Sequence, residues 1–107
     1  MSGPAPLPCP SYLGGSLARR WDELAPELQR LGTLDALNAD LCGKYILAEN
    51  EYTKISAMVQ QALKDEDAEA AGKWLAAQAR ITKQFLALGG ELGITPTARR
   101  ARGLARR

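Results

Sequence analysis

Apolar residues recur every three or four positions over most of the chain, the spacing of one face of an α-helix. This spacing predicts a first helix that Ser16 would cap and Gly32 would end. Pro26 interrupts the pattern and is expected either to kink this helix or to split it after Ala25. The apolar stripe of the helix consists of Leu17, Trp21, Leu24, Leu28 and Leu31.

Two longer stripes follow, separated by the polar and mostly acidic segment 64–70. The first opens at Thr33 or Asp35, includes Leu34 and Leu37, and runs for about 30 residues, which would span about 45 Å. The second has a heptad-like period over residues 71–92, with Gln78 as its one polar member. Two long helices joined by a short turn form an antiparallel hairpin.

The side chains expected in the seam of this hairpin are also the candidates for an interface between copies. We expect Trp74, Ile81 and Phe85 to be buried there. The full set is Leu41, Tyr45, Tyr52, Ile55, Val59, Trp74, Ile81, Phe85 and Leu88.

Further apolar side chains lie off the seam, among them Ile46, Met58, Leu75 and Leu86. A two-helix hairpin with one short helix does not enclose all of this surface. Either the first helix covers it or the protein self-associates, and the extent of the surface favours self-association.

The composition supports a single, small all-α domain, because Ala and Leu dominate while Val and Phe occur once each. Residues 1–15, rich in Pro and Gly, read as a flexible arm that is either disordered or loosely docked. Residues 16–95 form the helical oligomerisation domain. Residues 96–107 form a basic segment, in which Thr95 and Pro96 would start a short helix.

The charge is concentrated at the end of the chain. Five of the fourteen basic residues lie there with no acid among them, which leaves nine basic against twelve acidic residues in the rest. Such a block is typical of a segment that binds a polyanion or an acidic protein face, unless it is only a frayed, solvated terminus. The candidate DNA-binding residues are Arg99, Arg100, Arg102, Arg106 and Arg107.

No pattern in the sequence indicates an enzyme, a metal site or a cofactor. The chain has no histidine, and Cys9 and Cys42 are expected to be free thiols in a reducing cytoplasm. The three glycines of segment 88–93 lie at a helix end, without the strand that a phosphate-binding loop needs. No apolar run is long enough to span a membrane.

Two segments carry a family resemblance: RRWDELAPELQRLGTL (19–34) and ELGITPTARRARG (91–103), with the hairpin between them. In their order and spacing they resemble the small terminase subunits of tailed bacteriophages, over about residues 10–103. The resemblance implies a helical subunit without catalytic activity that closes into a homo-oligomeric ring of about eight to ten copies. It also implies binding to double-stranded DNA and to the large terminase, the ATPase–nuclease motor, in the cytoplasm of a bacterial host cell.

The chain departs from the general pattern of that family in two respects. The connection between its long helices is short, and residues 1–15 leave no room for a helix-turn-helix domain. A reduced form of this kind resembles the small terminase of a gene transfer agent, which packages DNA with little selectivity. The alternative is a helical adaptor or chaperone-like protein whose arginine tail docks an acidic partner. Salt-sensitive DNA binding would separate the two hypotheses.

Overall fold

The computed structural model describes residues 5–94 and contains three helices in that range. They are α1 (Ser16–Leu31), α2 (Ala39–Lys64) and α3 (Ala68–Leu92). The described residues contain no strand, so the all-α class is confirmed. The expected basic helix after Thr95 lies outside the described residues.

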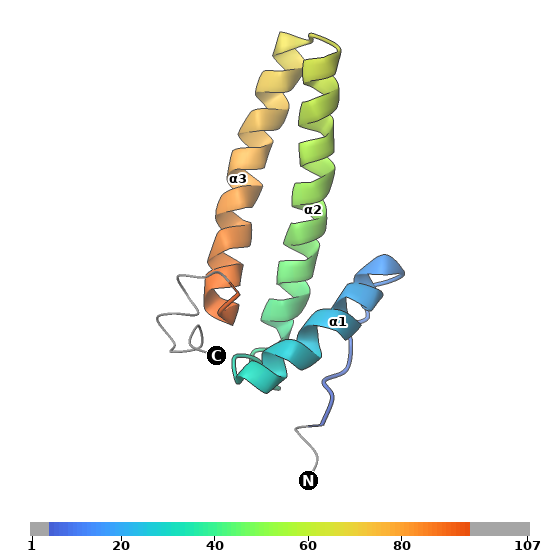
Figure 1. The fold of residues 1–107 in the computed structure, drawn as a ribbon, viewed down its shortest axis with the longest axis vertical. Helices are drawn as coiled ribbons and strands as arrows, with labels where there is room; N and C mark the ends of the chain where they lie inside the picture. Colours follow the sequence, from blue (N-terminus) through green and yellow to red (C-terminus); the bar gives the residue numbers. More distant parts are fainter. Residues whose placement is uncertain (1–4, 95–107) are drawn as a thin grey trace.

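Helices α2 and α3 lie side by side and run in opposite directions (Figure 1). A tight turn joins them, in which Glu66 adopts a left-handed conformation with φ of 54°. The N–H of Asp67 donates to the carbonyl of Ala62 at 3.0 Å, and the Asp67 side chain accepts from the N–H of Ala70 at 3.0 Å. The turn thus ends one helix and caps the next with a carboxylate, which the dipole of α3 favours.

Aromatic and polar contacts across the seam set the register of the hairpin. The Phe85 ring stacks on Tyr45 with centroids 4.9 Å apart and on Tyr52 with centroids 5.6 Å apart. Nearer the turn, Gln78 Nε2 donates to Ser56 Oγ at 2.9 Å, so the one polar residue of the α3 stripe has a partner. These contacts place residue 85 level with the middle of the 45–52 segment, and residue 78 level with residue 56.

Helix α1 crosses the open end of the hairpin, away from the turn (Figure 1). The main core lies at this crossing rather than along the seam. Side chains from all three helices meet there, together with residues of the connecting segments. The buried members are Leu13, Trp21, Ala25, Leu28, Leu34, Cys42, Tyr45, Ile46 and Leu92.

Helix α1 runs without interruption through Pro26, so neither a split after Ala25 nor a second helix is present. Pro26 and Asp22 are both exposed. Because Pro26 has no N–H, the carbonyl of Asp22 lacks its helical hydrogen bond. Both residues lie on the solvent side of α1, so this carbonyl is on the side that water reaches. At its ends, Gly15 rather than Ser16 is the N-cap, and Gly32 is the predicted left-handed C-cap with φ of 83°.

The prediction that the second helix begins at Thr33 or Asp35 is wrong, because α2 begins at Ala39. A side-chain-bonded turn takes the place of the first helical turn. Asp35 Oδ1 accepts the N–H groups of Leu37 and Asn38, and Asn38 Oδ1 accepts the N–H of Asp35. Such bonds compete with helical ones. Leu37 is consequently 97% exposed and takes no part in the α2 stripe.

The N-terminal segment 5–15, for which we expected a disordered or loosely docked arm, lies against the helices. Leu13 is buried, and the carbonyl of Leu7 accepts the Nε1–H of Trp21 at 3.2 Å. The Tyr12 hydroxyl donates to Asp40 Oδ1 at 2.6 Å. Partial burial and this bond raise the pKa of Tyr12 to about 12, so the hydroxyl stays a donor at neutral pH.

Gly43 of α2 allows this segment to approach the helix closely. A Cβ at this position would overlap the Tyr12 hydroxyl and would lie 3.2 Å from Pro10 Cγ. The sequence of the segment alone does not reveal this contact, because the glycine that permits it lies about 30 residues further along the chain.

Candidate functional site

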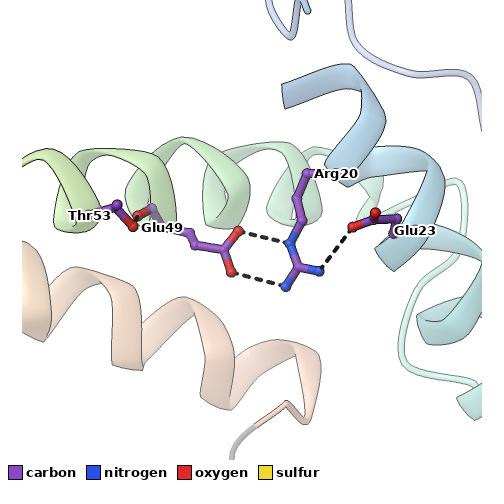
Figure 2. Close-up of polar contacts among 4 residues, drawn as sticks. All are labelled: Arg20, Glu23, Glu49 and Thr53. Atoms are coloured by element: carbon purple, nitrogen blue, oxygen red, sulfur yellow. Dashed lines mark hydrogen bonds and ion pairs between the residues drawn. The ribbon is translucent and has the colours of Figure 1, made fainter. Parts of the chain in front are cut away.

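A bidentate ion pair joins α1 to the hairpin. Arg20 Nε donates to Glu49 Oε1 at 2.8 Å, and Arg20 Nη2 donates to Glu49 Oε2 at 3.0 Å. Figure 2 shows the guanidinium between Glu49 of α2 and Glu23 of α1, whose Oε1 lies 3.6 Å from Nη1. The hydrogen bonds to Glu49 raise the pKa of Arg20 above its ordinary value. A permanently charged pair of this geometry orients helices and transfers no proton.

We expect Arg20 and Glu49 to be energetically coupled. Arg20→Ala and Glu49→Ala should each destabilise the fold, and the double variant should be more stable than the sum of the two losses implies. Because both side chains are about one third exposed, the coupling should be about 1 kcal/mol. Urea unfolding of the four proteins measures it. Purely additive losses would show that the pair does not hold α1 in place.

The nine candidate seam residues all lie on α2 and α3. Tyr45, Val59 and Ile81 are buried. We expected Trp74 to be buried, but it is only half-buried, because it lines an open groove on one side of the seam. The Lys73 ammonium lies 5.2 Å from the centroid of its ring. Phe85, which we also expected to be buried, is half-buried as well. The other half-buried members are Leu41, Tyr52, Ile55 and Leu88.

Helix α1 leaves apolar side chains of the hairpin exposed. Ile46, expected to be among them, is instead fully buried in the core that α1 completes. Leu47 and Met58 of α2 are 39% and 45% exposed, and Leu75 and Leu86 of α3 are 46% and 55% exposed. The alternative that α1 covers all of the apolar surface is therefore wrong.

The five candidate DNA-binding arginines lie outside the described residues. The structure instead draws attention to cations that sequence analysis missed, namely Lys73, Arg80 and Lys83 of α3. Their spacing of seven and three places them along one side of the helix. Within residues 5–94 none of them has a carboxylate within 4.0 Å, whereas Arg20 and Lys44 do. The sequence does indicate that these cations lack acidic neighbours on their own helix, because α3 has no acidic residue between Glu69 and Glu91.

Residues 5–94 were searched for metal ligands and for reactive thiols. This part of the chain holds no group of His, Cys, Asp and Glu side chains that could bind a metal ion. Burial raises the pKa of the Cys42 thiol to about 12, which makes it a poor nucleophile, and both cysteines are free. None of the described helices is long and apolar enough to cross a membrane.

Comparison with protein families identifies the chain. The sequence model described as "Phage terminase, small subunit" matches residues 18–105, which include all three helices except the first two residues of α1. The chain belongs to the phage terminase small-subunit family. The resemblance seen in the sequence is therefore confirmed, and membership indicates a role in phage DNA packaging. Small terminase subunits are generally non-catalytic, DNA-binding regulatory subunits.

The matched region of this small terminase subunit continues past α3 into the arginine tail, to residue 105. The hairpin and most of the basic segment therefore belong to one family domain. No characterised protein and no solved structure shows significant similarity to the chain.

Proposed function

We propose that this small terminase subunit is a non-catalytic DNA-packaging protein of the bacterial host cytoplasm. It assembles into a ring, binds double-stranded DNA weakly and without sequence preference, and recruits or regulates the large terminase ATPase–nuclease. The observation that carries the proposal is the family match, which runs through the helical hairpin and into the arginine tail.

Self-assembly is supported by the apolar surface that one copy leaves exposed. Leu47, Met58, Leu75 and Leu86 are each at least 39% exposed, and they extend along both long helices. Surface of this kind on a small protein usually marks an interface. Repetition of the subunit about an axis gives a ring of about eight to ten copies, the size that the family resemblance implies.

Non-specific DNA binding is supported by the kind of charge that the chain carries. The arginines of segment 99–107 can contact phosphates, and no aromatic residue accompanies them to stack on bases. Lys73 and Arg80 of α3 add two cations that have no carboxylate within 4.0 Å among residues 5–94. In a ring, each weak patch is repeated once per subunit, which raises the avidity for a long polyanion.

The tail is the part to test first. Deletion of residues 99–107 should weaken duplex binding and flatten the plot of log affinity against log salt by up to about 4–5 units, at about 0.9 per lost phosphate contact. The control replaces the same five arginines with lysine, which keeps the charge and should keep most of the slope. Mobility-shift titrations at several salt concentrations measure both variants, and light scattering checks that assembly is unchanged.

An unchanged affinity and slope in the deletion variant would reject the tail as a DNA contact. The same arginines would then be tested against the purified large terminase, as the adaptor alternative requires. Selectivity is tested with unrelated duplexes of equal length, and the low-selectivity, gene-transfer-agent form of the proposal expects their affinities to agree within about threefold. A strong preference for one sequence would contradict that form, because base readout typically discriminates by 1–3 kcal/mol for each contact.

A further inference from the structure

Four of the five large apolar side chains that the hairpin exposes form two pairs with the same spacing, and the fifth, Leu63, lies beside the turn. Leu47 and Met58 of α2 are eleven residues apart, and so are Leu75 and Leu86 of α3. Eleven residues make about three helical turns, so each pair lies on one side of its helix with about 16 Å between its members. Each helix therefore presents two apolar contact points at an equal separation.

The two pairs also lie at the same two heights along the hairpin. Gln78 is level with Ser56 through its hydrogen bond, and Phe85 is level with the segment between Tyr45 and Tyr52. Because both helices rise by 1.5 Å per residue, counting residues from these contacts gives the height of each α3 residue relative to α2. Leu75 comes within about one residue of the level of Met58, and Leu86 within about one residue of the level of Leu47.

The two pairs face opposite sides of the hairpin. The groove on one side of the seam is lined by Glu51 of α2, which shares a helix face with Leu47 and Met58, and by Trp74, Arg80 and Gln84 of α3. Leu75 and Leu86 do not line this groove, and their positions on the helical wheel place them on the other side of α3. One subunit thus has two different apolar faces that point away from each other.

Each of the two faces also carries charged side chains. The α2 outer face consists of Leu47, Glu51, Lys54 and Met58, and the α3 leucine face consists of Leu75, Ala79, Lys83 and Leu86. By the register above, Lys83 lies level with Glu51, between the two apolar heights. Neither has an oppositely charged side chain within 4.0 Å among residues 5–94. The two faces therefore match in spacing, and Lys83 of one face matches Glu51 of the other in charge and in height.

We propose that the α3 leucine face of one subunit packs on the α2 outer face of the next, with Leu86 against Leu47, Leu75 against Met58, and Lys83 paired with Glu51. This inference rests on the self-assembly in the proposed function and assigns its surfaces and register. The contact is heterologous, because the two faces differ, so it repeats around an axis. Because its contact points lie at equal heights on both faces, successive subunits have no axial offset, which is the condition that a closed ring requires.

Two variants test the assignment directly. One carries Leu75→Glu and Leu86→Glu, and the other carries Leu47→Glu and Met58→Glu. Glutamate is placed on both faces so that the altered faces cannot attract each other. All four positions are exposed, so circular dichroism should show wild-type helicity. Each variant alone should be monomeric, with self-affinity reduced at least tenfold. An equimolar mixture should form a 1:1 heterodimer and nothing larger, because one intact face of each kind remains.

Native mass spectrometry of wild type, the variants and the mixture separates the outcomes. Assembly of either variant at wild-type size, or a mixture that stays monomeric, would overturn the assignment while the ring proposal stands. A monomeric wild-type protein would instead overturn the self-assembly on which the inference rests. If two α3 leucine faces contacted each other instead, the variant with Leu47→Glu and Met58→Glu would still form a dimer. A monomeric state of this variant therefore rejects such a contact.

A charge exchange decides the register even if the glutamate variants fold poorly. Lys83→Glu and Glu51→Lys should each weaken assembly severalfold, and the protein carrying both should recover at least half of the loss. Lys73→Glu combined with Glu51→Lys is the matched control, because Lys73 lies about two to three turns nearer the tip of the hairpin. Recovery in the control, or none in the exchange, would contradict the pairing.

Discussion

Replacement of Trp21 by alanine should destabilise the protein by about 3–5 kcal/mol, the range for deleting a buried aromatic side chain. Trp21 is 2% exposed, and it lies where the N-terminal segment, α1 and α2 meet. The variant also loses the 3.2 Å hydrogen bond from Nε1 to the carbonyl of Leu7. For a domain of this size the melting temperature should fall by roughly 10–30 °C.

Trp74 provides the matched control, because the chain has only these two tryptophans. Trp74 is half-buried beside an open groove, so Trp74→Ala should cost no more than about 2 kcal/mol. Thermal unfolding is followed at equal protein concentration, since assembly shifts the midpoint by mass action. If Trp74→Ala costs as much as Trp21→Ala, the core does not lie at the crossing of α1.

Local features were readable from the sequence wherever the decisive residues are close together in the chain. The stripe of α1 includes Trp21 and Leu28, both of which the structure buries. Gly32 ends α1 in the predicted left-handed conformation, and Asp67 caps α3 within the segment expected to hold the turn. In each case one or two neighbouring residues supply the physical cause.

Errors arose where side chains outside the stripe changed the local structure. Leu37 fits the apolar spacing, yet the hydrogen bonds of Asp35 and Asn38 form a turn and leave it exposed. Pro26 was expected to disturb α1, but it occupies the exposed side, where the lost hydrogen bond is tolerated. A stripe thus indicates which residues can be buried together, while competing bonds decide where the helix begins.

The candidate site depended on placement that no local pattern contains. Arg20 and Glu49 are 29 positions apart, and neither has a neighbour that marks it as a partner. Likewise, Ile46 and Leu47 look alike in sequence, but the crossing of α1 buries one and leaves the other exposed. The matching heights of the exposed leucines follow only from the register of the hairpin, which the contacts of Phe85 and Gln78 across the seam set.

Phe85 should therefore matter for both stability and assembly. Its ring lies between Tyr45 and Tyr52, and Phe85→Ala removes both stacked contacts from the middle of the hairpin. Because the ring is half-buried, we expect a loss of about 2–4 kcal/mol, seen as a shift in the urea midpoint without a large change in slope. Phe85→Leu keeps most of the volume and should lose only about 1 kcal/mol.

The effect on assembly follows from the same geometry. Without the ring, α3 is no longer held at one level against α2, so the α3 leucine face and the α2 outer face lose their common heights. Phe85→Ala should then weaken self-association under conditions where the subunit is still folded, whereas Phe85→Leu should assemble like wild type. Native mass spectrometry at low temperature measures this. A Phe85→Ala protein that melts within about 2 °C of wild type and assembles fully would show that another contact sets the hairpin register.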